Sequence, residues 1–77
     1  MTELQLYKFI SENMLDIQWV GGDLILWVDY YCIGEFAEMV YEAIDCVNFQ
    51  RNCIALNIIP ICEYFDIDPH NICKKEE

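Results

Sequence analysis

Basic residues are scarce in this sequence. Its 77 residues hold four Lys and Arg against fourteen Asp and Glu, and the formal net charge is −10. None of the four basic residues lies between Phe9 and Gln50. Proteins that bind nucleic acid directly place Lys and Arg against phosphates, and anionic membrane surfaces attract basic segments. The charge balance therefore argues against nucleic acid and membrane as direct partners.

Long apolar runs are also absent. No stretch reaches the roughly 18 apolar residues that a membrane-spanning helix needs. The first residues, Met-Thr-Glu-Leu-Gln, lack the basic and then apolar regions of a secretory signal. We therefore expect a cytoplasmic protein.

The residue patterns of catalytic and metal sites are missing as well. The one histidine, His70, has Cys73 three residues on, but none of the five cysteines forms a Cys-x-x-Cys pair. Gly21-Gly22 is not a phosphate-binding loop, because no helix follows it directly. We predict a non-enzymatic protein with free thiols, no cofactor and no metal. A weak enzyme or metal protein centred on His70 and the cysteines stays open as a third hypothesis.

Hydrophobic residues are abundant and make up 56 % of the chain. This content argues against intrinsic disorder, and the length is that of one domain, residues 1–77. So small a domain cannot bury all of this apolar surface. Exposed apolar surface is typical of interfaces, which favours a homodimer or an obligate partner.

The first half of the chain shows a helix followed by a hairpin. Thr2 and Gln5 have the spacing of a capping box at the start of a helix over about 3–13, within a segment 1–14. Alternating residues on both sides of Gly21-Gly22 predict a β-hairpin. Its second strand, 24–31, is apolar on both faces. We expect that strand to be covered on both sides or to present one side to a partner.

The segment 33–45 has the clearest helical pattern and completes a unit over 15–45. Its apolar positions alternate with carboxylates three or four residues apart. Like charges at this spacing weaken a helix by a few tenths of a kcal/mol per pair. The carboxylates predict one acidic stripe along the helix, which consists of Glu35, Glu38, Glu42 and Asp45.

The second half, 46–73, resembles the first. A strand at Val47–Phe49, a turn and a strand at Cys53–Asn57 echo the first hairpin, and helix starts follow at Pro60 and at Asp68-Pro69. Duplication of a hairpin–helix unit and coincidence both fit the pattern. We predict an α+β fold: an N-terminal helix, then two β-hairpin–helix units that form a four-stranded antiparallel sheet with helices on one face.

The segment Ile58–Pro69 resembles the end of small proteins carried by phages and mobile elements of gut bacteria. In size and acidity the whole chain is similar to phage-encoded antagonists of host defence, of the anti-CRISPR and antirestriction type. That resemblance implies an inhibitor which presents carboxylates where a nuclease expects phosphates.

Two functional hypotheses follow. In the first, the acidic stripe docks into a basic nucleic-acid-binding groove of a protein partner, with Tyr41 beside it. Asp16, Asp23 and Asp29 on the hairpin extend the acidic area, or dimerisation doubles it. In the second, the protein is a homodimeric interaction module, its apolar surface is the contact, and charge only provides solubility. Salt separates the two, because it weakens an acidic contact and not an apolar one.

Overall fold

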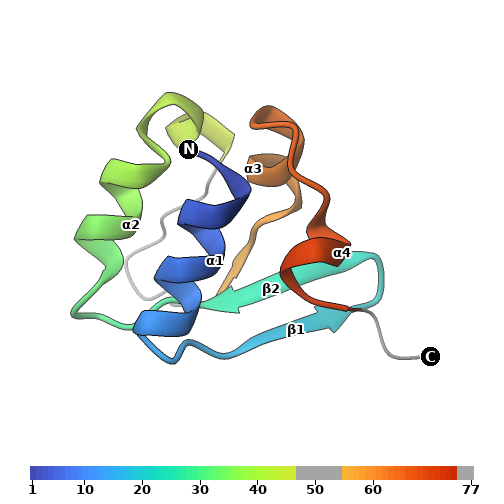
Figure 1. Cartoon of the computed structure of the whole chain (residues 1–77), viewed down its shortest axis with the longest axis horizontal. Helices are drawn as coiled ribbons and strands as arrows, with labels where there is room; N and C mark the ends of the chain where they lie inside the picture. Colours follow the sequence, from blue (N-terminus) through green and yellow to red (C-terminus); the bar gives the residue numbers. More distant parts are fainter. Residues whose placement is uncertain (47–54, 75–77) are drawn as a thin grey trace.

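The computed structural model describes residues 1–46 and 55–74 and packs short helices against a small sheet. In Figure 1 α2 and α3 lie above strands β1 and β2, α1 reaches down to their left-hand ends and α4 overlaps β2, and no described helix is drawn below β1. The elements in chain order are α1 (Glu3–Glu12), β1 (Ile17–Val20), β2 (Asp23–Trp27), α2 (Ile33–Met39), the 3-10 helix η1 (Tyr41–Cys46), β3 (Ala55–Asn57), α3 (Ile59–Tyr64) and α4 (Pro69–Ile72).

Helix α1 begins and ends through local hydrogen bonds. The predicted capping box is confirmed: the Thr2 hydroxyl accepts from the Gln5 N–H at 3.2 Å, and the Gln5 side chain accepts from the Thr2 N–H at 2.8 Å. At the other end Met14 has a φ of 50°, and the Leu15 N–H donates to the Ile10 carbonyl at 3.0 Å. This is the left-handed turn that commonly closes helices.

The predicted hairpin is confirmed, but its second strand is shorter than the predicted 24–31, because β2 ends at Trp27. Strands β1 and β2 pair antiparallel, with Ile17 opposite Leu26 and Val20 opposite Asp23. Gly21, in the turn, has a φ of 62°, which glycine adopts without the steric cost that a Cβ would add.

The prediction of a four-stranded sheet is wrong. Over residues 1–46 and 55–74 the sheet has three antiparallel strands in the order β1-β2-β3. Strand β3 pairs directly with β2, with Leu56 opposite Leu26 and Ala55 opposite Trp27. The strand predicted at 47–49 lies outside the described residues. An alternating pattern reports which face of a strand is apolar, and it does not report which strand lies alongside.

The helix predicted over 33–45 is shorter than expected. Helix α2 ends at Met39, Val40 is its C-cap, and η1 follows with Ala43 at non-helical angles. The last turn of α2 has no basic residue, and its carboxylates repel one another. Val40 and Ala43 are nevertheless buried, at 0 % and 1 % exposure. The two side chains therefore stay packed in the core although the helix is interrupted between α2 and η1.

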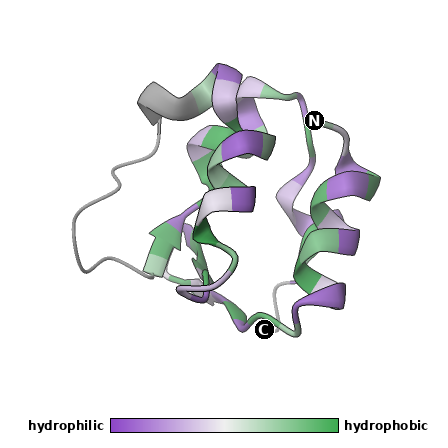
Figure 2. Ribbon diagram, turned by 90° about the vertical axis from the view of Figure 1, so that its left-hand side faces the viewer, coloured by the Kyte–Doolittle hydropathy of each residue, from purple (hydrophilic) through white to green (hydrophobic). Residues whose placement is uncertain are grey.

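One hydrophobic core joins the helices to the upper face of the sheet. Helices α1 and α2 each carry hydrophobic and hydrophilic residues around their turns (Figure 2). The apolar residues that they bury meet Leu24 and Leu26 of β2. The buried members of the cluster are Leu6, Phe9, Leu24, Leu26, Val28, Cys32, Phe36, Val40, Leu56, Ile58, Ile61, Cys62, Ile67 and Ile72.

Candidate binding surface

The carboxylates of the predicted stripe are divided between two elements. Glu35 and Glu38 lie on α2, and Glu42 lies in η1; all three are exposed. Tyr41, next to Glu42, is 74 % exposed. Asp45 belongs to η1, and its side chain lies outside the described part. The stripe is thus not a feature of one continuous helix.

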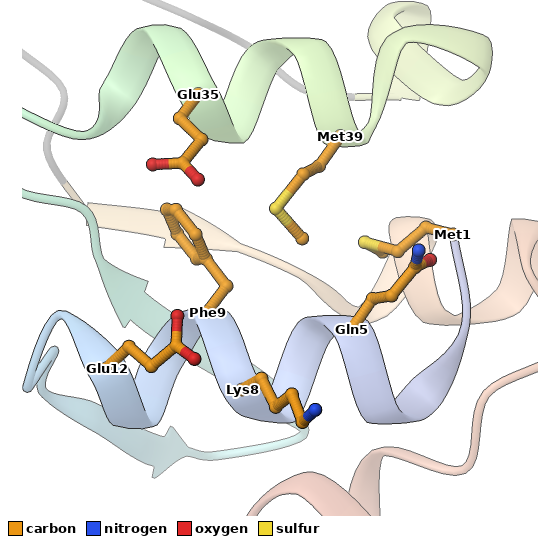
Figure 3. A pocket seen from close by; sticks show the side chains of 7 residues that line it. All are labelled: Met1, Gln5, Lys8, Phe9, Glu12, Glu35 and Met39. Atoms are coloured by element: carbon orange, nitrogen blue, oxygen red, sulfur yellow. The ribbon is translucent and has the colours of Figure 1, made fainter.

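Glu35 lines a groove between α1 and α2. Figure 3 shows Glu35 and Met39 pointing from α2 toward α1, and Phe9 and Glu12 pointing from α1 toward α2. The groove has a volume of about 420 Å³. Its full lining is Met1, Gln5, Lys8, Phe9, Glu12, Glu35 and Met39.

The groove combines an apolar floor with charged edges. Phe9 is 4 % exposed, packs its ring 5.7 Å from that of Phe36, and forms the floor. The Met39 thioether adds a soft apolar wall. Glu12 and Glu35 stand on either side of Phe9. A Lys or Arg side chain from a partner fits this arrangement, because its stem is apolar and its head is cationic.

The structure separates the hairpin carboxylates from α2. Asp23 begins β2 and is exposed, and it shares a face with Ile25 and Trp27, opposite the face that the helices cover. Asp29 is exposed in the turn between β2 and α2, where its carbonyl accepts from the Cys32 N–H at 3.0 Å. The predicted binding residues therefore do not form one surface: Asp23 lies on the far side of the sheet from Glu35.

A cluster that the sequence did not reveal lies where β1 meets the C-terminal segment. The His70 ring stacks on Trp19, with centroids 4.9 Å apart and planes inclined by 30°. His70 Nδ1 lies 3.2 Å from an Asp68 carboxylate oxygen. Asp68 also caps α4, as predicted, by accepting from the His70 N–H at 2.9 Å. Pairing of residues some 50 positions apart leaves no local signal in the sequence.

Cys32, Cys62 and Cys73 are free thiols: the first two are buried, and Cys73 is partly exposed. Burial raises the pKa of the Cys62 thiol from 9.0 to about 11, and the charges of Asp68, Glu3 and Glu63 add to the rise. A thiol with so high a pKa is a poor nucleophile at neutral pH. No group of three metal-ligating side chains occurs within residues 1–46 and 55–74.

Comparisons with known proteins return no relative: no family model, no curated protein and no solved structure matches the chain. Over the described residues, none of the helices has the length and apolar character needed to cross a membrane. Any account of function therefore depends on the surface chemistry.

Proposed function

We propose that the protein is a non-enzymatic acidic binding protein. It docks its α2–η1 carboxylates and the edge of the α1–α2 groove onto a basic surface of a protein partner. An inhibitor of a nuclease or another nucleic-acid-handling defence protein, carried by a phage or mobile element, is the form that its size and charge favour. The partner's nucleic-acid-binding groove supplies the Lys and Arg side chains.

The observation that carries this proposal is that Glu35, Glu38 and Glu42 have no cationic partner among the described residues. In the described part of the chain the one acid–base contact within ion-pair distance joins Asp68 to His70. Glu35, Glu38 and Glu42 are exposed and outside such contacts. A field of one sign raises the association rate of a partner with the opposite sign. No ion pair within the protein has to be broken before these carboxylates bind a partner.

Charge density sets the size of the contact. A helix rises about 1.5 Å per residue, so the seven residues of α2 span about 10 Å. B-DNA carries one charge per about 1.7 Å of axis, so two carboxylates on α2 are a sparse imitation. Glu12 across the groove and Glu42 on η1 widen the acidic area. The partner therefore has to contact carboxylates on α1, α2 and η1 at the same time.

Two charge-matched variants test the proposal. Glu38→Lys on α2 and Glu63→Lys on α3 change the net charge equally, and both side chains are exposed. Each variant and the unmodified chain serve as bait in pull-downs from the native host, at low and at high salt. We expect partners at low salt that Glu38→Lys loses and Glu63→Lys retains. Equal loss with both variants shows that net charge alone attracts the partner, and capture that persists at high salt contradicts an acidic contact.

Exposed tyrosines favour the second candidate, a homodimeric module. Tyr30 and Tyr31 are 81 % and 94 % exposed, and their rings lie edge to face at 6.1 Å. Large exposed aromatic side chains are enriched at interfaces. Light scattering at rising protein concentration tests this candidate: a mass of two chains supports it, and a mass of one chain at high micromolar concentration contradicts it. Tyr31→Ser, which removes apolar area and no charge, must then shift the dimer toward monomer.

A further inference from the structure

The lower face of the sheet is a second surface that is open in the described structure. The helices cover the face of Leu24 and Leu26, and the alternation along β2 places Ile25 and Trp27 on the other face. Both of these side chains are partly exposed. Val20 on β1 lies on the same face and is 52 % exposed. No described helix is drawn below β1 (Figure 1).

Asp16 and Trp27 are neighbours on this face. The backbone N–H of Trp27 donates to the backbone carbonyl of Asp16 at 2.9 Å. This bond continues the pairing of Ile17 with Leu26 by one residue. Directly opposed residues in an antiparallel pair have Cβ atoms about 4.5–5.5 Å apart and point to the same side. The side chains of Asp16 and Trp27 therefore leave the backbone side by side on this face.

Two hollows adjoin this pair. One, of about 350 Å³, is lined by Asp16, Ile17, Gln18 and Trp27. The other, of about 250 Å³, lies toward the end of α1 and also includes Asp16 and Trp27, together with Asp29. Asp16 and Trp27 thus line both hollows.

The charges on this face have one sign. Asp16 and Asp23 are exposed on it, and Asp29 stands at its edge. Strands β1, β2 and β3 contain no Lys or Arg. Lys74 lines a third hollow, which shares Ile17 and Gln18 with the first of the other two but does not include Asp16 or Trp27. A second copy of the chain would bring like charges together here, whereas a cationic side chain finds both an aromatic face and carboxylates.

We propose that the lower sheet face receives an arginine side chain of the basic partner, stacked on Trp27 and paired with Asp16. Tryptophan is the ring that attracts cations most strongly. Arginine suits this pair better than lysine, because its planar guanidinium stacks on a ring while it donates hydrogen bonds sideways to a carboxylate. This inference rests on the proposed function, since it takes the partner to be a basic protein. It adds a second contact of that partner, on the face of the sheet opposite the α2–η1 carboxylates, and the side chain preferred there.

The test uses two synthetic peptides, octa-arginine and octa-lysine, as defined basic probes. Nuclear magnetic resonance of the unmodified protein reports separate indole N–H signals for Trp19 and Trp27. The Trp19 indole is already hydrogen-bonded to the Cys73 carbonyl at 2.7 Å, so it serves as the internal reference. We expect octa-arginine to shift the Trp27 signal more than the Trp19 signal, and more than octa-lysine does.

Variants then separate stacking from charge. Trp27→Leu keeps an apolar side chain, and we expect it to lower the affinity for octa-arginine by roughly threefold to tenfold while that for octa-lysine changes less. Asp16→Asn removes the paired carboxylate and should reduce the arginine preference too. Glu38→Gln removes one charge from α2 and should lower both affinities alike, without changing their ratio.

Failure of the two proposals is distinguishable. If both peptides bind equally well and Trp27→Leu leaves their ratio unchanged, the arginine site on the sheet is wrong and the acidic binding function stands. If neither peptide binds even at low salt, the acidic binding function itself fails. If the Trp27→Leu protein does not fold, the peptide titration of the unmodified protein still tests the site. Equal shifts of the Trp19 and Trp27 indole signals would contradict it.

Discussion

The indole Nε1–H of Trp19 donates a hydrogen bond of 2.7 Å to the backbone carbonyl of Cys73, 54 residues further along the chain. Together with the His70 ring stacked on Trp19, this bond fastens the segment after α4 to strand β1. Strand β1 lies at one edge of the described three-stranded sheet. The C-terminal segment thus lies beside this edge.

Replacement of Trp19 tests how much this bond contributes. Trp19→Phe keeps an aromatic ring but removes the donor, so we expect the free energy of unfolding to fall by about 1–3 kcal/mol. Urea unfolding followed by circular dichroism measures it. Trp27→Phe is the matched control, because Trp27 is on the open face of the sheet; an equal loss in both variants would show that the bond to Cys73 contributes nothing specific.

The Cys62 thiol makes stability depend on pH in alkaline solution. Its pKa is about 11 in the folded protein and 9.0 ordinarily, mainly because burial disfavours the thiolate. Below pH 9 the thiol is protonated in both states. Between pH 9 and 11 only the unfolded chain loses the proton, so stability falls as pH rises, by about 2 kcal/mol in all.

Denaturant titrations from pH 8 to 11 measure this dependence. Other groups titrate in the same range, so the comparison is with Cys62→Ala. That variant is less stable at every pH, but its stability should decline less steeply. Parallel curves for the two proteins would contradict a raised pKa at Cys62.

Charge reversal on α2 should separate binding from stability. Glu38 lies three residues after Glu35, in a helix whose last turn has no basic residue. Glu38→Lys replaces repulsion by attraction and places a cation near the negative end of the helix. We expect the free energy of unfolding to rise by about 0.5 kcal/mol while partner association slows. Thermal unfolding and association kinetics measure the two effects; a fall in stability would mean that Glu38 has a structural role.

The hairpin turn offers a prediction with a close control. Gly21 has a φ of 62°, whereas Gly22 does not have a positive φ, and neither has atoms within 4 Å of an added Cβ. Gly21→Ala should therefore cost about 1 kcal/mol through backbone strain. Gly22→Ala should change stability much less. Urea midpoints of the two variants give the answer, and equal midpoints would exclude strain at Gly21.

The end of α1 provides the opposite case. Met14 has a φ of 50° and is 88 % exposed, so its side chain gains little from burial. Met14→Gly should relieve the left-handed strain and raise the free energy of unfolding by about 0.5–1 kcal/mol. Asn13→Gly, one residue earlier, should lower it, since the Asn13 side chain donates to the Phe9 carbonyl at 2.9 Å. A destabilised Met14→Gly protein would reject this account.

Local patterns in the sequence predicted the elements that depend on neighbours along the chain. The capping box at Thr2, the hairpin turn at Gly21 and the cap of α4 at Asp68 each involve residues within a few positions of one another. The pairing of β3 with β2 joins Trp27 to Ala55 across 28 residues, and periodicity carries no information about it. That is why the predicted sheet was wrong although its first hairpin was right.

The candidate binding surface was predicted by residue type better than by position. Spacing alone placed Glu35, Glu38 and Glu42 on one helix, because a helical period was extended past Met39. The structure turns the chain there: Val40 is the C-cap of α2, Ala43 has non-helical angles, and both side chains are buried. The role of Glu12 opposite Glu35 could not be read from the sequence, because it requires the packing of α1 beside α2.

The central place of β2 has a consequence for how the chain folds. Its contacts with β1 form across a two-residue turn, and such hairpins close within microseconds. Its contacts with β3 need the chain between Val28 and Ile54 to close a long loop, which costs entropy before any pairing is gained. We expect α1 and the first hairpin to assemble early and β3 to arrive late. Changes in β3 should then speed unfolding more than they slow folding.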